Sequence, residues 1–421
     1  MEPGQRLLVR IAAGLVRFAN LFLAVVERLL FPVATRSPKR IGVLRVGTVR
    51  EVLVALPAVR VLRARYPSAK LIWITSPGPK GTPGWPALAE QNEYEQQLVW
   101  YTDDLESRAG RRSLLIRLRL ARLDRVFVLP EERTGFTPEL RRLVALRLAG
   151  VRGVRGVRIT VARGLPWPLG NLLGPAFDRG VEGPRESDRL LKGVGASPPS
   201  RPPGRGRDDV GRAPQAAARF ESISGRGTGP WLAISPGAQL TKQRWPTASF
   251  AEIARRWIDR GGRVVLLGAP SERALAEKIA VEARLDRDPD AVLQWAGEVD
   301  LRGSAEVLRR CSLALANDSG AMHLAAELGI PGAGLFSGVD RPRVFEPVLE
   351  SIRTLRGSAA CAPCFERGCL LDRACLRGIE VETVWQALLE TAQPLREPLA
   401  QDREGPPAAL PGATAPAASG R

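Results

Sequence analysis

The chain has 421 residues, of which 44% are hydrophobic, and its formal net charge is +18. This length exceeds a single ordinary core, so we expect two globular domains with additional segments. The charge favours an acidic partner, such as an anionic membrane surface or a phosphorylated substrate. Only 5% of the residues are aromatic and no RNA-binding signature or zinc-finger spacing occurs, which argues against a specific nucleic acid.

Residues 1–35 predict an amphipathic helix. Its polar residues fall on one helical face and include Arg6, Arg10, Arg17 and Glu27. The uncharged run from Phe18 to Val26 is shorter than the roughly 20 residues that span a bilayer, so we expect no crossing. The arginines and the lack of a cleavage site do not fit a signal peptide. Two interpretations stay open: a helix anchored in the membrane surface, and a helix docked on the protein's own core.

Two series of alternating strands and helices follow. The first predicts an N-terminal domain over residues 36–177, with strands at 41–46, 71–75 and 125–129 and helices at 51–65 and 140–148. The second predicts a C-terminal domain over residues 230–393, with strands at 231–234, 263–268, 291–295, 313–316 and 334–336. The alternation indicates an α/β fold of two Rossmann-like doubly wound domains facing a central cleft, with ligands at the carboxyl ends of the strands.

Composition marks the remaining segments. Residues 178–229 are rich in Pro, Gly and Arg and are predicted to be a linker, with a short helix at 187–193. Residues 394–421 are rich in Pro and Ala and are predicted to be a disordered tail.

The only histidine, His323, lies in a segment that predicts an anion site. An apolar strand at 313–316 runs into the polar residues Asp318 and Ser319, and a helix begins at Gly320. The first turn of a helix presents unpaired N–H groups and a partial positive charge, and glycine allows close backbone approach. The simpler interpretation is a helix cap and a histidine hydrogen-bonded to backbone.

Several segments together resemble glycosyltransferase family 9, the heptosyltransferase family of lipopolysaccharide core synthesis. The strongest is Asp318 to Ala326 followed by Gly329-Ile330-Pro331, which is similar to the family's nucleotide-sugar motif. The supporting segments, which occur in the family's order, are Leu53 to Ala58, Ser235 to Ala238, Arg244-Trp245-Pro246 and Gly268 to Glu272.

The resemblance implies a GT-B fold, with the acceptor on the N-terminal domain and an ADP-sugar on the C-terminal one. It implies inverting, metal-independent transfer of a heptose or related sugar to a lipopolysaccharide-core or other lipid-linked saccharide. The family's base is an acidic residue within a Gly-Asp pair, and the matching positions here are Arg50 and Glu51. Glu51 is therefore the expected catalytic base, although the helix dipole also favours a glutamate in the first turn.

The resemblance also implies the binding residues. The family places a lysine two residues before its Trp-Pro pair, where this chain has Gln243, so Lys242 is expected to substitute. The full expected donor set is Thr241, Lys242, Arg244, Glu272, Asp318, Ser319, Gly320 and His323. Four arginines near the expected base, Arg45, Arg50, Arg60 and Arg63, are candidates for an acceptor that carries carboxylates or phosphates.

Four cysteines form a second cluster, at Cys361, Cys364, Cys369 and Cys375. Their spacing can surround a tetrahedral ion, and similar cysteines recur in some members of the resembled family. A structural zinc or an iron–sulfur cluster and ordinary buried thiols both remain open; no cofactor is expected for catalysis. The pair Asp286 and Asp288 is interpreted as part of a solvated loop rather than a metal site.

The leading hypothesis is thus a cytoplasmic glycosyltransferase, peripheral on the inner face of the cytoplasmic membrane. The alternative is a non-catalytic nucleotide-binding relative of the same fold that acts as a binding or scaffolding protein, motivated by the altered Arg50-Glu51 and Gln243 positions. A dinucleotide dehydrogenase is not expected, because no Gly-x-Gly-x-x-Gly follows the first strand of either domain.

Overall fold

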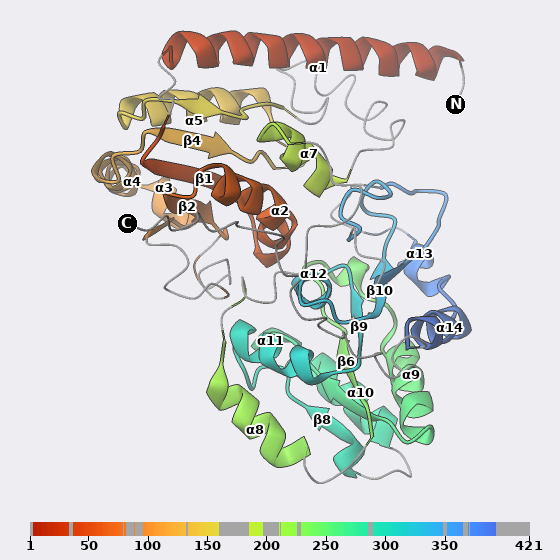
Figure 1. The fold of residues 1–421 in the computed structure, drawn as a ribbon. Coiled ribbons are helices and arrows are strands. Elements are labelled where there is room, and N and C mark those ends of the chain that lie inside the picture. Colours follow the sequence, from red (N-terminus) through yellow and green to blue (C-terminus); the bar gives the residue numbers. More distant parts are fainter. Residues whose placement is uncertain are drawn as a thin grey trace, which may run out of the picture.

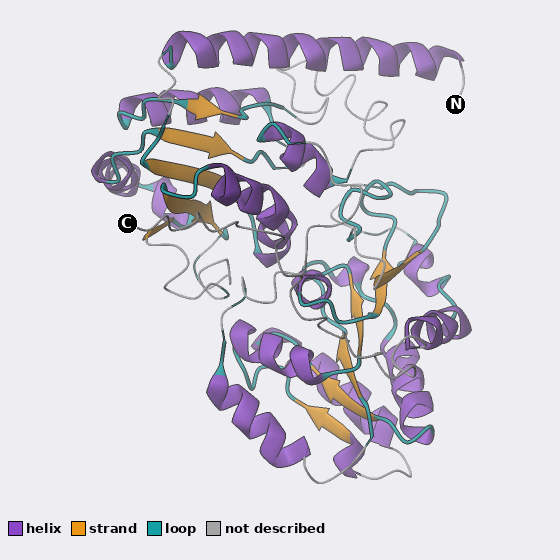
Figure 2. Ribbon diagram, viewed as in Figure 1, coloured by secondary structure: helices purple, strands orange, loops and turns teal. Residues whose placement is uncertain are grey.

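The computed structural model has two α/β domains, each built on a parallel sheet (Figures 1 and 2). It describes residues 3–32, 37–78, 80, 88, 96–131, 134–159, 185–196, 210, 212–224, 229–284, 289–347, 352–364, 369 and 371–392. The fold class predicted from the alternation of strands and helices is confirmed. The predicted tail at 394–421 and the pair Asp286 and Asp288 lie outside the described residues.

The N-terminal sheet has five strands in the order β3-β2-β1-β4-β5, and all its pairings are parallel. Its strands are β1 (Arg40–Val46), β2 (Lys70–Ser76), β3 (Gln96–Val99), β4 (Arg125–Val128) and β5 (Val154–Arg155). Its helices are α2 (Val49–Arg65), α3 (Thr102–Glu106), α4 (Arg108–Leu120) and α5 (Phe136–Leu148). The apolar centres of β1 and β2 are buried on both faces, as expected of central strands in a parallel sheet.

The C-terminal sheet has six parallel strands in the order β11-β10-β9-β6-β7-β8. Its strands are β6 (Trp231–Ser235), β7 (Arg263–Leu266), β8 (Val292–Gln294), β9 (Leu313–Asn317), β10 (Gly332–Phe336) and β11 (Ile352–Arg356). Its helices are α9 (Thr247–Asp259), α10 (Arg273–Arg284), α11 (Leu301–Arg310), α12 (Gly320–Glu327), α13 (Ala374–Arg377) and α14 (Val381–Ala392), with short 3-10 turns η3 (Thr241–Gln243), η4 (Pro270–Glu272) and η5 (Pro289–Ala291). The strand order reverses between β6 and β9, and such a switch point is where doubly wound sheets bind ligands.

The range 178–229 contains two described helices. The short helix predicted at 187–193 is observed as α7 (Glu186–Gly193), which packs on α2 of the N-terminal domain. The second, α8 (Pro214–Ser224), packs on α11 of the C-terminal domain, where its Phe220 contacts Trp231 and Trp295. Each of these helices therefore extends one domain.

The N-terminal helix α1 (Pro3–Leu30) lies across the N-terminal domain on the side of α5, away from the C-terminal domain (Figure 1). One face is docked: Ala12 and Leu23 are buried, the Asn20 side chain hydrogen-bonds the backbone of Ile159, and Arg155 pairs with Glu27 at 3.1 Å. By length and composition alone the segment Arg6–Leu30 could cross a membrane, so the argument that the helix is too short to span was wrong.

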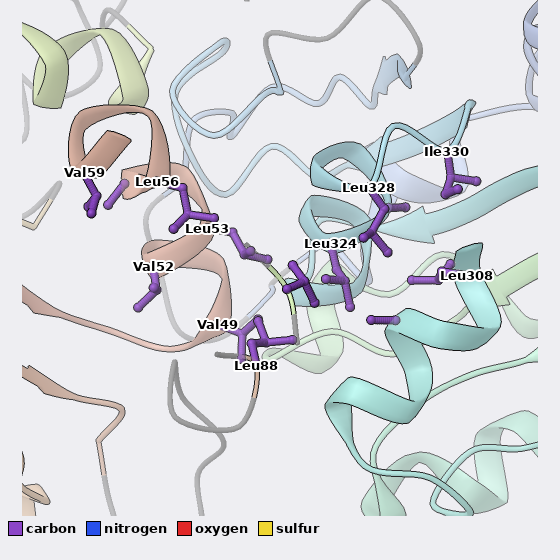
Figure 3. Packing of buried hydrophobic residues seen from close by; sticks show 14 of the residues in the cluster. Val49, Val52, Leu53, Leu56, Val59, Leu88, Leu308, Leu324, Leu328 and Ile330 are labelled. Atoms are coloured by element: carbon purple, nitrogen blue, oxygen red, sulfur yellow. The ribbon is translucent and has the colours of Figure 1, made fainter. Parts of the chain in front are cut away.

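The two domains share an apolar interface between α2 and α12. Figure 3 shows Val49, Leu53 and Leu56 of α2 beside Leu324 and Leu328 of α12, within one cluster of buried residues. The Arg60 guanidinium pairs with the Glu327 carboxylate across the same interface. Because both helices begin directly after the carboxyl end of a strand, this packing brings the ligand-binding ends of β1 and β9 together.

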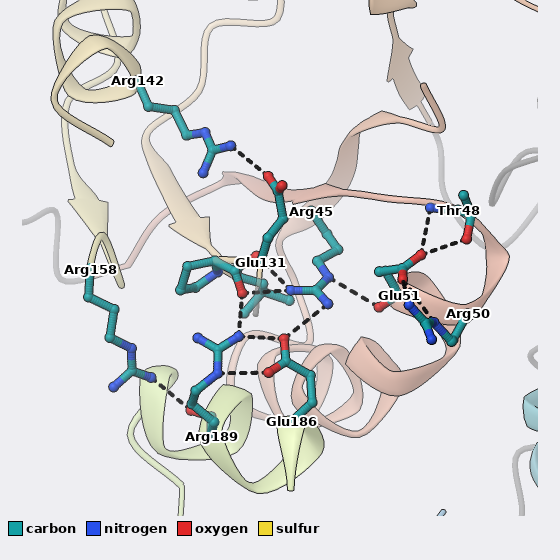
Figure 4. A network of polar contacts seen from close by, with 11 residues as sticks. Arg45, Thr48, Arg50, Glu51, Glu131, Arg142, Arg158, Glu186 and Arg189 are labelled. Carbon is teal, nitrogen blue, oxygen red and sulfur yellow. Dashed lines mark hydrogen bonds and ion pairs between the residues drawn. The ribbon is translucent and has the colours of Figure 1, made fainter. Parts of the chain in front are cut away.

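A buried ion pair anchors α7 to the N-terminal sheet. The fully buried Arg45 on β1 pairs with Glu186 on α7 at 3.1 Å and donates hydrogen bonds to the carbonyls of Pro130, Leu129 and Glu51 (Figure 4). Arg189 binds the same carboxylate. Burial lowers the pKa of Arg45, although the Glu186 charge opposes this shift. A buried charge without its partner is strongly unfavourable, so each member of the pair depends on the other.

We predict that Glu186→Gln lowers the free energy of unfolding by about 3–5 kcal/mol, because it leaves the Arg45 charge buried without its counter-ion. Urea unfolding monitored by circular dichroism measures this change. The matched control is Arg152→Gln, which removes a guanidinium that is 71% exposed beside Asp124 and should cost less than about 1 kcal/mol. Equal losses for the two variants would contradict a special role for the buried pair.

Candidate functional site

The first turns of α2 and α12 meet at the domain interface and form the candidate site. A Cβ atom placed on Gly320, the first residue of α12, would lie 3.3 Å from the Val49 side chain and 3.9 Å from the Arg50 backbone nitrogen. Glycine at this position permits the close approach of the two helices. The expected base Glu51 and the expected donor residues Asp318 to His323 are thereby brought to one place.

Asn317 organises the donor side of the site. Its side-chain oxygen accepts a hydrogen bond from the Trp245 backbone at 3.0 Å, and its nitrogen donates to the Pro236 carbonyl at 2.7 Å. This buried residue thus ties the end of β9 to the loop after β6 and to the segment before α9. These three chain segments meet at the point where the strand order of the sheet reverses, as expected for a nucleotide site.

Three buried polar atoms at the start of α12 have no hydrogen-bond partner among the described residues: Asp318 Oδ1, Ser319 Oγ and His323 Nε2. Asp318 Oδ1 and His323 Nε2 are 3.8 Å apart, which is too long for a hydrogen bond. Buried polar atoms are normally paired, since leaving one unpaired costs about 1–3 kcal/mol. Together with the N–H groups of the first helical turn, these atoms offer donors and acceptors to a polar, anionic ligand.

The expected base Glu51 is held by its own loop. Its Oε2 accepts hydrogen bonds from the Thr48 backbone N–H at 2.9 Å and from the Thr48 hydroxyl at 2.6 Å, which closes a capping box at the start of α2. Burial alone would raise the pKa of Glu51, but the Arg50 charge, the Thr48 hydrogen bond and Arg45 outweigh it and lower that pKa to about 2. In this arrangement the Thr48 hydrogen bonds fix the orientation of the Glu51 carboxylate, and its low pKa makes it a weak base.

Arg50 connects the two domains electrostatically. Its guanidinium lies 2.9 Å from Glu51 Oε1, 3.1 Å from Asp318 Oδ2 and 3.9 Å from Asp340 Oδ2, and it stacks on the Phe345 ring at 4.1 Å. Burial would lower the pKa of Arg50, but the three carboxylates raise it, so the group stays charged. Burial would likewise raise the pKa of Asp318, and Arg50 and His323 lower it.

The other expected donor residues surround the same end of the sheet. Thr241 and Lys242 lie in η3, where the buried Lys242 Nζ is 3.9 Å from Cys364 Sγ. Arg244 donates to the Ala238 carbonyl at 3.0 Å, so its guanidinium supports the loop after β6. The Glu272 carboxylate accepts from the Ala269 N–H, and a Cβ on Gly237 would lie 1.9 Å from Glu272 Oε1, so glycine is needed beside this carboxylate.

Three of the four predicted acceptor arginines are not placed to bind an acceptor at the site. Arg45 is fully buried in its pair with Glu186. Arg60 pairs with Glu327 across the interface. Arg63 is exposed near the end of α2, about 18 Å along the helix from Glu51, and donates to the Ala69 carbonyl. Proximity in sequence to Glu51 was misleading, because β1 and α2 carry these residues away from it. Only Arg50 lies at the site.

The four-cysteine metal site is not assembled in the structure. Across the described residues, which include all four cysteines, no group of three or more His, Cys, Asp or Glu is arranged to hold a metal ion. The cysteines face different neighbours: Cys364 faces Lys242, Cys369 accepts a hydrogen bond from the Arg373 backbone, and Cys375 is buried beneath Gly338 in the core of the C-terminal domain. The spacing was compatible with a tetrahedral site, but the described residues do not form one.

Sequence reasoning missed Asn317, Asp340 and Phe345 as site residues. Asn317 stands at the start of the motif around His323, and its position at the end of an apolar strand was an available signal. Asp340 and Phe345 lie after β10 and reach the site only because that connection folds back over Arg50. No pattern in the sequence indicates that contact.

Comparison with known proteins finds the same fold, and a match over part of the chain to the family that the motifs resemble. Residues 207–374 match the model for "Glycosyltransferase family 9 (heptosyltransferase)". Lipopolysaccharide heptosyltransferase 2 of Escherichia coli K12 is 27% identical over 73% of this chain and 85% of its own length. Lipopolysaccharide heptosyltransferase 1 of Pseudomonas aeruginosa is 34% identical over a shorter region, 33% of this chain and 38% of that protein.

Among solved structures, E. coli ADP-heptose lps heptosyltransferase II aligns with a TM-score of 0.59 and 22% identity, covering 84% of this chain and 98% of that one. E. coli heptosyltransferase WaaC with ADP aligns with a TM-score of 0.56 and 18% identity, covering 84% and 100%. These similarities establish the GT-B arrangement of two Rossmann-like domains. The match to glycosyltransferase family 9 covers residues 207–374, and the relatives that align with this chain are named heptosyltransferases.

Proposed function

We propose that this protein is an inverting glycosyltransferase that moves a heptose, or a related sugar, from an ADP-sugar to a lipopolysaccharide-core or similar lipid-linked acceptor. The observation that carries the proposal is the convergence of Glu51 with the unpartnered polar atoms of Asp318, Ser319 and His323 at the domain interface. Several relatives are named lipopolysaccharide heptosyltransferases, which supports the sugar and acceptor class.

In the proposed reaction the diphosphate of the donor binds at the start of α12, with Lys242 of η3 as a further cation, and the Glu272 carboxylate accepts ribose hydroxyls. Glu51 removes the proton from the acceptor hydroxyl as that oxygen attacks the anomeric carbon, and the nucleoside diphosphate leaves on the opposite face. Direct displacement inverts the anomeric centre. The protein then needs one base and groups that stabilise the departing negative charge, and the site offers both kinds.

Glu51→Gln should reduce transfer from ADP-heptose by at least about 10²-fold, because the amide cannot take the acceptor proton. ADP affinity, measured by calorimetry, should not be weakened. The matched control is Glu106→Gln, an exposed carboxylate of the same domain, which should retain full turnover. Turnover by Glu51→Gln would refute the assignment, and ADP binding by the wild-type protein without turnover on a broad acceptor panel would favour the non-catalytic alternative.

We further propose that the protein works at the membrane surface, on the cytoplasmic side, with α1 as its contact. The face of α1 opposite the docked side chains exposes large apolar residues, including Phe18 at 69%, Leu21 at 64% and Leu29 at 73%. Insertion of α1 across the bilayer would break the Asn20–Ile159 and Glu27–Arg155 contacts that hold it on the domain. A helix docked by one face and lying in the headgroup region keeps those contacts and buries its apolar side chains.

The double variant Phe18→Asp/Leu29→Asp should abolish flotation with vesicles of phosphatidylethanolamine and phosphatidylglycerol, since it places charge in the proposed lipid contact. The control Leu120→Asp/Val281→Asp changes apolar side chains of comparable exposure, 72% and 55%, on α4 and α10. It should float like the wild-type protein. Flotation of both variants, or loss of flotation by both, would contradict the assignment of α1 as the lipid contact.

A further inference from the structure

Arg50 holds the acceptor-side base and the donor-side carboxylates in one cluster. Glu51 belongs to the N-terminal domain, whereas Asp318 and Asp340 follow β9 and β10 of the C-terminal domain, and a single guanidinium contacts all three carboxylates. The side chain is only 16% exposed. One positive charge among three negative ones leaves the cluster with excess negative charge, and Arg50 is the cation that its three carboxylates share.

The same contact borders the proposed diphosphate site. Val49 and the Arg50 backbone lie within 4 Å of where a Gly320 side chain would begin, at the first turn of α12. Ser319, Gly320 and Ala321 stay partly exposed there, so a diphosphate that binds the N–H groups of that turn would lie next to Arg50. The phosphate oxygens can accept two parallel hydrogen bonds from a guanidinium, as a carboxylate does, and they gain in addition from the positive end of α12.

We propose that Arg50 is a positioning residue that couples donor binding to the base: its guanidinium moves from Glu51 to the donor's diphosphate, and this exchange releases Glu51. This inference rests on the proposed function. Arg50 then stabilises charge on the leaving group, and Glu51 stays oriented by the Thr48 backbone and hydroxyl, which do not depend on Arg50.

The charged groups around Glu51 determine what the exchange does to its basicity. Two arginines of the N-terminal domain, Arg45 of β1 and Arg50 of α2, face Glu51. The charged and titratable groups of the C-terminal domain, Asp318, Asp340 and His323, lie on the far side of Arg50. Loss of the Arg50 contact removes the strongest influence that lowers the pKa of Glu51 and leaves the weaker influences of the Thr48 hydrogen bond and the Arg45 charge. The pKa then rises from about 2 toward the ordinary value of 4.5, which makes Glu51 a stronger base.

The affinities of ADP and AMP, measured by calorimetry on the full chain, test this inference. ADP differs from AMP by one phosphate, so the ratio of their affinities isolates the contact with the second phosphate. Arg50→Gln should lower the preference for ADP over AMP by about tenfold or more, and Arg50→Lys should restore part of it. The control Glu327→Gln, which breaks the other ion pair between α2 and α12, should leave the preference unchanged.

The pH dependence of transfer by the wild-type protein gives a second readout. Glu51 acts as a base only when ionised, so activity falls as pH drops through its pKa. The profile of kcat/KM for the donor reports the free protein, and that of kcat reports the donor complex. The acid limb of kcat should lie at higher pH than that of kcat/KM, because Arg50 has left Glu51 in the complex.

An unchanged ADP preference in Arg50→Gln, an equal change in Glu327→Gln, or coincident acid limbs would overturn the inference while leaving the proposed function in place. Failure of the wild-type protein to bind either ADP or ADP-heptose would overturn both.

Discussion

The packing of α2 against α12 is the contact on which the site depends. Leucine and valine side chains from both helices join one buried cluster, and this places the first turns of the two helices against each other. Carboxylates from both domains are thereby brought close together in a poorly solvated region. Arg50 compensates their charge, so apolar packing and one guanidinium together define the geometry around Glu51 and Asp318.

The excess of arginine has a structural explanation over much of the described chain. Arg45 and Arg189 neutralise the buried Glu186, and Arg309 and Arg310 neutralise the buried Glu306 on α11. Arginine suits such positions because its planar guanidinium remains charged when buried and donates several hydrogen bonds. Part of the positive charge that first indicated an acidic ligand therefore serves the core and the contacts between helices and sheets.

The departures from the family pattern near the base are coupled to each other. Glutamate in place of aspartate lengthens the side chain by one methylene, and the Thr48 hydrogen bonds hold its carboxylate back against its own loop. Arginine in place of glycine then reaches from the same turn to Asp318 and Asp340 of the other domain. An altered pair of residues can thus be consistent with catalysis, provided that donor binding draws Arg50 away from Glu51.

The sequence by itself determined the two α/β domains, the strand and helix that flank His323, and the resemblance to a family, because apolar periodicity and motifs can be read along the chain. Short strands such as β3 and β5 carry too few residues for a pattern, and they are defined by pairing with β2 and β4. Tertiary structure alone decided which arginines are buried, where the cysteines lie, and that Asp340 and Phe345 reach Arg50. Those outcomes depend on contacts between distant residues, such as the 268 positions that separate Arg50 from Asp318, and such contacts leave no periodic trace in the sequence.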